Sequence, residues 1–309
     1  MEATIPASSK VAPIPRVPKE VLRRIPPSDN PFVTDINGMI AQLNALGEKL
    51  PRRYGWRYRT AEGMRAEAAE IATTATDCLA FNVLYWRDQL SNWEAYTLMN
   101  SLRVIDLARS CVWALAREDA VCASLLARSA LETAAAFVDA SRTVTATICG
   151  KGTKQTPGTI LDPPTDLRKT AVVSEELELY SLKTIFASRL PESETIYNPT
   201  NIVTIITRIS KIQAQEFVLP TYGVLCEAAH PNMLGRALYL HGSEPGQWEG
   251  NELRTLGPGN GPAWHFLAGA IVAALSWSCA TQVSAFNLIT GTISAAMDRL
   301  KLAEHNLAT

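Results

Sequence analysis

The sequence predicts an all-α protein, a bundle of about eight helices around a buried apolar helix. Three observations support this fold class. Long stretches are rich in alanine, leucine, glutamate and arginine, and their apolar residues recur at helical spacing. Proline, which breaks helices, is absent from residues 60–149. Only residues 236–241 come near the alternation of apolar and polar side chains that indicates a strand.

Residues 1–32 differ in composition from the rest of the chain. They contain seven prolines, and only residues 18–24 resemble a turn of helix. Proline fixes φ and removes a backbone donor, so this region is predicted to be a proline-rich extended arm. We expect the arm to be available to a protein partner. The remaining residues, 33–309, are predicted to form a single helical domain.

Apolar spacing and capping signals place the helices of this domain in order. The first covers 34–49, where Thr34 and Asp35 supply the start signal. Asn92, after a serine, is expected to cap a helix at 92–116. Asp119, after a glutamate, is expected in the first turn of a helix at 118–147. The other predicted helices lie near 60–82, 166–188, 200–214, 215–230, 263–289 and 291–307. Residues 150–164 and 242–262 are predicted to be loops.

Charge and cysteine usage limit the function classes. The net charge is −1, so no overall field directs the chain to nucleic acid. The six cysteines show no Cys-x-x-Cys spacing and mostly lie among small apolar residues. That pattern is typical of core residues in a reducing compartment and indicates neither a disulfide framework nor a zinc site. We therefore expect a cytoplasmic protein with no cofactor and no metal.

The apolar segment 255–297 contains no aspartate, glutamate, lysine or arginine. It is longer than the roughly 20 residues that a membrane span requires. Serine, threonine, glutamine and asparagine dilute the apolar run, and no basic cluster flanks it to set a topology. We therefore interpret 263–289 as a helix buried on all sides within a soluble protein, with a membrane span as the alternative.

Two polar pairs stand out in apolar surroundings. Arg128 and Glu132 are four residues apart on one predicted helix, and Glu227 and His230 are three apart on another. Pro231 disfavours the α conformation for the residue before it, so this second helix should end at the histidine. Buried charges need partners, so we predict that the two faces meet, Arg128 against Glu227 and Glu132 against His230. In the alternative, Arg128 and Glu132 form an ion pair with each other on a solvated strip of their own helix.

The segments that carry these pairs resemble a known family. Leu126-Ala-Arg-Ser-Ala-Leu-Glu132 and Tyr222-x-x-Leu-Cys-Glu-x-x-His-Pro-Asn232 are similar to the Arg-Ser-x-x-Glu helix and the Tyr-x-x-Leu-Ser-Glu-x-x-His-Pro-Asn segment of uncharacterised bacterial helical proteins. That family is similar in layout to the HEPN (higher eukaryote and prokaryote nucleotide-binding) domains, many of which are metal-independent ribonucleases. Cys226 departs from the family pattern, which has serine there. The resemblance implies an all-α core and a polar cluster of candidate catalytic residues: Arg128, Glu132, Glu227, His230 and Asn232.

A basic and aromatic loop is the candidate nucleic-acid interface. Residues 52–59 hold four arginines and three aromatic residues. Guanidinium groups bind phosphates and aromatic rings stack on bases, so the loop suits single-stranded RNA. In the alternative, the aromatic residues anchor the loop on the core and the arginines lie over the surface. The candidate RNA-binding residues are Arg52, Arg53, Trp56, Arg57 and Arg59.

Two function hypotheses from different classes follow. The leading one is a HEPN-like helical accessory or effector protein of a bacterial defence or stress system that acts on RNA. The alternative is a non-catalytic interaction or scaffold protein whose polar cluster is structural. A mononuclear metal site using Glu132, Glu227 and His230 is a third reading. We expect a homo-oligomer and no membrane partner, and the sequence leaves open whether the chain is an enzyme.

Overall fold

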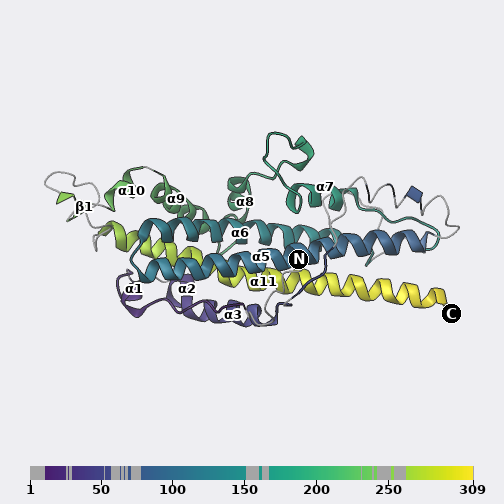
Figure 1. Ribbon diagram of the computed structural model, residues 1–309, viewed down its shortest axis with the longest axis horizontal. Helices are drawn as coiled ribbons and strands as arrows, with labels where there is room; N and C mark the ends of the chain where they lie inside the picture. Colours follow the sequence, from purple (N-terminus) through teal and green to yellow (C-terminus); the bar gives the residue numbers. More distant parts are fainter. Residues whose placement is uncertain are drawn as a thin grey trace, which may run out of the picture. The chain divides into compact units, whose positions relative to one another are not determined.

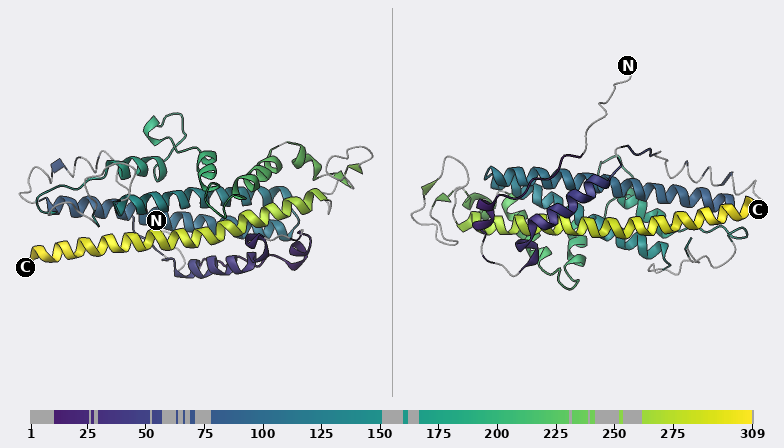
Figure 2. Two further views of the ribbon diagram at one scale, coloured as in Figure 1. Left: turned by 180° about the vertical axis from the view of Figure 1, so that it is seen from behind. Right: turned by 90° about the horizontal axis from the view of Figure 1, so that it is seen from below.

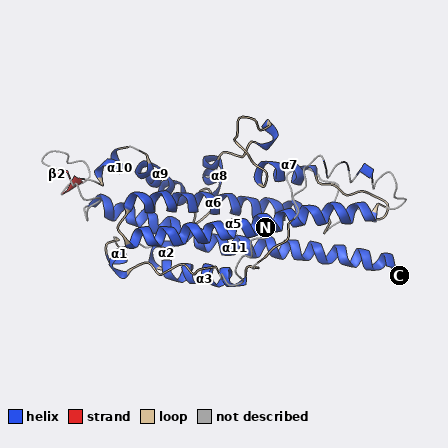
Figure 3. Ribbon diagram, in the orientation of Figure 1, coloured by secondary structure: helices blue, strands red, loops and turns tan. Residues whose placement is uncertain are grey.

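The computed structural model describes residues 11–25, 27, 30–51, 53–56, 63, 66, 69–70, 78–150, 160–161, 167–230, 232–238, 240–241, 252–253 and 262–308. Within these residues the chain is all-α, as predicted (Figures 1 and 3). The helices are α1 (Lys19–Arg23), α2 (Pro31–Thr34), α3 (Ile36–Lys49), α5 (Leu79–Ala116), α6 (Ala120–Ile148), α7 (Glu175–Thr184), α8 (Ile202–Ile209), α9 (Val218–Ala229), α10 (Met233–Ala237) and α11 (Pro262–Ala308). A 3-10 turn covers Thr195–Tyr197, and the two-residue strands β1 (Leu240–His241) and β2 (Glu252–Leu253) pair antiparallel.

Several predicted helices appear close to their expected bounds. Helix α3 matches 34–49, and α6 matches 118–147. The Asp119 carboxylate accepts a hydrogen bond from Cys122 N at 3.0 Å, which satisfies a donor of the first turn of α6. Helices α8 and α9 lie within the predicted 200–214 and 215–230. Most of the predicted helix 60–82 lies outside the described residues.

Two predicted breaks between helices are absent. Helix α5 runs without a break from Leu79, so Asn92 lies inside the helix, where it is buried and accepts a hydrogen bond from Trp56 Nε1 at 2.9 Å. The predicted helices 263–289 and 291–307 are one helix, α11, which both views of Figure 2 show as uninterrupted. The exposed Gly291 does not break it. One glycine costs a helix only about 1 kcal/mol, which apolar contacts on both sides offset.

The chain divides into two compact units, each assembled from three segments. Unit 1 comprises 1–52, 100–136 and 202–284, and unit 2 comprises 53–99, 137–201 and 285–309. In unit 1, every residue of α11 from Ile271 to Cys279 is buried. Ser276, Ser278 and Gln282 are buried with them, and Gln282 Nε2 donates to Ser101 Oγ at 2.9 Å. This part of α11 is a core element of unit 1.

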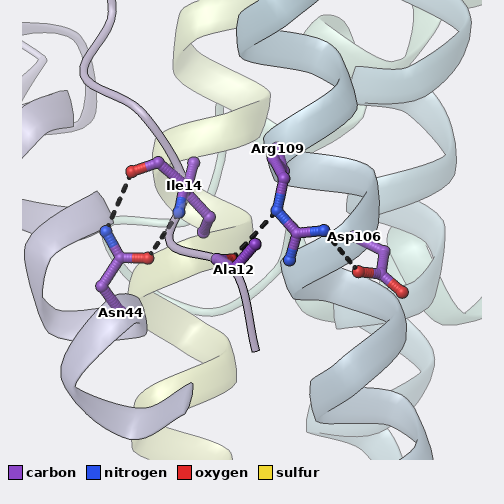
Figure 4. Close-up of polar contacts among 5 residues, drawn as sticks. All are labelled: Ala12, Ile14, Asn44, Asp106 and Arg109. Atoms are coloured by element: carbon purple, nitrogen blue, oxygen red, sulfur yellow. Dashed lines mark hydrogen bonds and ion pairs between the residues drawn. The ribbon is translucent and has the colours of Figure 1, made fainter. Parts of the chain in front are cut away.

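Part of the predicted arm is packed into unit 1. Residues 11–18, called here the strap, lack helix and lie against α3, and Ile14 and Val17 are buried. Asn44 of α3 forms two hydrogen bonds with the backbone of Ile14, accepting from its N–H at 2.8 Å and donating to its carbonyl at 3.0 Å (Figure 4). Arg109 of α5 donates to the carbonyl of Ala12 at 3.0 Å. Side chains on two helices therefore hold the backbone of an extended segment.

Unit 2 holds a second extended segment in the same way. Residues 171–174 precede α7, which begins later than the predicted 166–188. Asn82 of α5 donates to the carbonyls of Leu167 and Thr170 at 2.8 and 2.9 Å and accepts from Val172 N at 2.7 Å. Trp86 Nε1 donates to the Val172 carbonyl at 3.0 Å. These bonds satisfy backbone groups that helix formation would otherwise have used.

Two of the described helical segments, 120–148 and 264–302, are long and apolar enough to cross a membrane. Length and composition alone give this result, and the buried core helix of a soluble protein passes the same test.

Candidate functional site

The α6 side of the candidate site is an ion pair within one helix. Arg128 Nε donates to Glu132 Oε1 at 3.0 Å, the contact expected for residues four apart on a helix. Their side chains keep 26% and 28% of their surfaces exposed. Alanine and leucine neighbours on the same helix, including Ala127 and Leu131, are buried. The pair therefore lies at the edge of the core and is partly open to solvent.

Helix α9 contributes a tyrosine to this pair. The Tyr222 hydroxyl donates to the same Glu132 oxygen at 3.0 Å, although the two residues are 90 positions apart. The Arg128 guanidinium carbon lies 5.6 Å from the centre of the Tyr222 ring, within the range of a cation–π contact. Arg128, Glu132 and Tyr222 form the structural group that we call the clasp. The clasp joins α6 to α9 within unit 1.

The surroundings of the clasp shift the pKa values of Arg128 and Tyr222. Burial lowers the pKa of Arg128, but the hydrogen bond and charge of Glu132 outweigh it, so the net pKa lies above the ordinary value. Burial, a hydrogen bond with Cys226 and the Glu132 charge raise the pKa of Tyr222 to about 12. At neutral pH Arg128 is therefore a cation and Tyr222 a neutral hydroxyl donor.

The C-terminus of α9 holds the other predicted site residues. The helix ends at Ala229, and His230 is its exposed C-cap with extended backbone, as the following proline predicts. Asn232 Nδ2 donates to Glu227 Oε1 at 3.0 Å. Gly235 of α10 lies close to the last carbonyls of α9, because a Cβ there would be 2.9 Å from the His230 oxygen. The chain therefore turns tightly after the histidine, and only glycine fits at that approach.

The predicted partners across the two helices are wrong, although α6 and α9 do meet. Arg128 pairs with Glu132 of its own helix, where Glu227 was expected. Glu132 accepts from Tyr222, where His230 was expected. The reason is helical geometry: Tyr222 and Cys226 are four apart on one face, and Glu227 lies about 100° around the helix, on the exposed side. The helical spacing of Val218, Tyr222 and Leu225, which form the buried face of α9, is the sequence signal that could have identified the tyrosine.

The described part of the basic loop is tied to α5 within unit 2. The Tyr54 hydroxyl donates to Glu94 Oε2 at 2.7 Å, and Trp56 bonds Asn92. Arg53 is exposed. Arg52, Arg57 and Arg59 lie outside the described residues. Tyr54 and Trp56 thus anchor the loop on α5, as the alternative to RNA binding expects.

Among the described residues there is no group of three or more histidine, cysteine, aspartate or glutamate side chains that could hold a metal ion. Glu132, Glu227 and His230, which the sequence suggested as metal ligands, do not form such a group. The carboxylate of Glu132 instead has two protein donors.

The raised pKa of Tyr222 predicts how stability depends on pH. Its folded value of about 12 exceeds the ordinary 10.0, so its contribution is complete below pH 10 and is lost as the pH rises through about 12. The free energy of unfolding of the native chain should exceed that of Tyr222→Phe by a constant amount below pH 10, and this difference should shrink between pH 10 and 12. Urea denaturation of both proteins across this range measures it. A difference that stays constant to pH 12 would contradict the raised pKa of Tyr222.

Comparisons of the chain with family models, with curated proteins and with solved structures find no match.

Proposed function

We propose that this chain is a non-catalytic helical interaction protein of the cytoplasm, in which the clasp has a structural role. One observation carries the proposal. Glu132 Oε1 accepts hydrogen bonds from Arg128 on its own helix and from Tyr222 on α9, both at 3.0 Å. If the site were catalytic, the Glu132 carboxylate would have to contact the substrate, but it already accepts two hydrogen bonds from the protein.

The charge balance of the clasp also favours a structural role. A guanidinium that already faces a carboxylate has less net attraction for a phosphate, because the two charges largely cancel at a distance. The Tyr222 hydroxyl donates its proton to Glu132 and its ring faces Arg128, so both features of the tyrosine are used within the protein. Such an arrangement fixes the position of α9 on α6 and so shapes the surface of unit 1.

A second candidate is the HEPN-like RNA effector of a bacterial defence or stress system. It is favoured by the exposure of His230 at the end of α9 and by the partial exposure of Arg128. Arg128 uses only Nε toward Glu132 among the hydrogen bonds of the described residues, which leaves its terminal nitrogens for an anion. An exposed imidazole can act as general acid or base, and a guanidinium can steady a phosphate.

Two measurements on three variants separate the candidates. Glu132→Ala should lower the free energy of unfolding by about 1–3 kcal/mol, because it leaves a partly buried guanidinium and a hydroxyl without their acceptor. His230→Ala should change it by less than about 0.5 kcal/mol, since the side chain is exposed. Glu132→Gln is the matched control, because it keeps an acceptor oxygen and removes the charge. It should therefore lower the free energy of unfolding by less than Glu132→Ala does.

The same proteins are then incubated with single-stranded RNA, and the RNA length is followed. The proposed function predicts no cleavage by the native chain or any variant. Cleavage by the native chain that disappears in His230→Ala, with the denaturation curve unchanged, would establish the second candidate and overturn the first. A denaturation curve unaffected by Glu132→Ala would show that the clasp does not hold α9.

A further inference from the structure

Helix α3 binds the backbone of the strap at two places through its side chains. Asn44 bonds both backbone groups of Ile14, at 2.8 and 3.0 Å, and Asn37 accepts from the N–H of Val17 at 2.9 Å. The two asparagines are seven residues apart, which places them on one face of the helix about 10.5 Å apart along its axis. Three residues of polyproline II cover about 9.3 Å. The two amides therefore have the spacing that binds an extended chain at every third residue.

Each strap residue whose backbone a helix side chain binds is followed by a proline. These residues are Ala12, Ile14 and Val17, and the carbonyl of Ala12 accepts from Arg109 of α5 at 3.0 Å (Figure 4). A proline disfavours the α conformation for the residue before it and fixes its own φ at the polyproline II value. The sequence thus restricts the strap to extended conformations before it docks, and this reduces the entropy that docking costs.

Only two side chains of the strap are deeply buried. Ile14 is 3% exposed and Val17 is 2% exposed, whereas Ala12, Pro13 and Arg16 are exposed. Side chains three apart lie on one face of polyproline II, which has three residues per turn. The surface under the strap therefore selects two apolar side chains three residues apart. Its hydrogen bonds go to backbone groups, which other extended segments also carry.

The strap is a contact set that a separate segment can reproduce. Residues 11–18 lie outside the helices and strands of the chain, so their contacts need no continuous secondary structure with the rest of unit 1. Docking of a preformed polyproline II segment is a recurrent mode of protein association, because that conformation leaves its backbone groups free for a partner. A segment from another protein with the same pattern offers the same groups to α3 and α5.

We propose that the surface of α3 and α5 under the strap is a binding site for a proline-containing extended segment of a partner protein, with the strap as its competitor. The proposal rests on the proposed function as an interaction protein and names the site and the class of partner. The partner segment carries two apolar residues three apart, each followed by proline. The site is open only in molecules whose strap has detached, so the apparent affinity for the partner falls in proportion to that fraction.

A dye-labelled synthetic peptide of residues 11–18 is the probe, and its fluorescence anisotropy measures binding to the full-length chain. Val17→Asp should bind this peptide at least tenfold more tightly than the native chain does, because the altered strap no longer occupies the site. A peptide with Ile14→Asp and Val17→Asp is the control and should bind neither protein.

Further changes test the individual contacts. Asn44→Ala added to Val17→Asp should weaken peptide binding about tenfold, because it removes two of the four backbone hydrogen bonds. A peptide with Pro13→Gly and Pro15→Gly should also bind more weakly, since a flexible segment loses more entropy. The same two glycine changes in the full-length chain loosen the strap without burying a charge, and should raise its affinity for the unaltered peptide above that of the native chain. Circular dichroism shows whether Val17→Asp folds, and the glycine variant decides the question if it does not.

Three results would count against these proposals. Equal affinity of the native chain and both opened variants for the peptide, or no binding by either variant with its helical signal retained, would overturn the binding site. A native chain of twice the 33.7 kDa mass in light scattering that becomes single in Val17→Asp would show that straps exchange between two copies, which would also overturn it. RNA cleavage dependent on His230 would instead overturn the proposed function, so the two failures are distinguishable.

Discussion

Asn82→Ala should lower the free energy of unfolding by about 2–4 kcal/mol, the largest effect we expect from one polar residue of the described chain. Asn82 is fully buried in α5, and its amide bonds three backbone groups, the carbonyls of Leu167 and Thr170 and the N–H of Val172. Alanine would leave these three groups buried without their partner, and each such loss costs about 1–3 kcal/mol unless water enters. The segment before α7 should then detach from unit 2.

Urea denaturation followed by circular dichroism measures this effect, and limited proteolysis locates it. Cleavage of the variant should appear first between 167 and 174. Asn287→Ala, at an exposed position of α11, makes the same chemical change and should alter the free energy by less than about 0.5 kcal/mol. Equal denaturation curves for Asn82→Ala and the control would show that the amide does not hold this segment.

Val17→Asp should destabilise unit 1 by about 3 kcal/mol, because it buries a carboxylate without a cation. Val17 is 2% exposed, and its N–H donates to Asn37 Oδ1 of α3 at 2.9 Å. The strap would have to leave α3 for the carboxylate to reach water, and with it the contacts of Ile14 would be lost. The expected result is therefore a less stable protein whose N-terminal region is open to protease.

Ala12→Asp is the matched control for the strap, since it adds the same charge at an exposed position of the same segment. It should leave the denaturation midpoint nearly unchanged, because the Ala12 contact with Arg109 uses only the backbone carbonyl. If Val17→Asp behaved like Ala12→Asp, the strap would be a free arm rather than part of the core of unit 1.

Helix identity in this chain follows from local sequence, but helix length does not. Apolar spacing identified α3, α6, α8 and α9, although α8 ends at Ile209, five residues before its expected end. The helix breaks expected at Asn92 and at residue 290 are absent. A residue that can cap a helix does so only where its side chain bonds a terminal backbone group, and inside a continuous helix those groups already bond each other. Asn92 instead bonds the distant Trp56, and this tertiary contact lets the helix continue. Helix α7 begins later than expected, at Glu175, because the residues before it bond the Asn82 side chain of α5.

The candidate site shows the same division. The residue types and the end of α9 at His230 were predictable, because the i, i+4 spacing of Arg128 and Glu132 and the effect of Pro231 are local. The types of residue on the two helices did not predict which residue of α9 contacts Glu132. Charge complementarity suggested Glu227 and His230, and the rotation of α9 about its axis presents Tyr222 instead.

The sequence by itself determined the all-α class and the helical positions of the polar residues, because each depends on a period of a few residues. Only the tertiary structure decided that the strap packs on α3, that the chain divides into two units of interleaved segments, and that Tyr222 completes the clasp. These features join residues far apart in the chain: Tyr222 and Glu132 are 90 positions apart, and Arg109 and Ala12 are 97 apart. Their formation depends on which packed arrangement buries much apolar surface while most buried polar groups keep hydrogen-bond partners, and no local pattern specifies that choice.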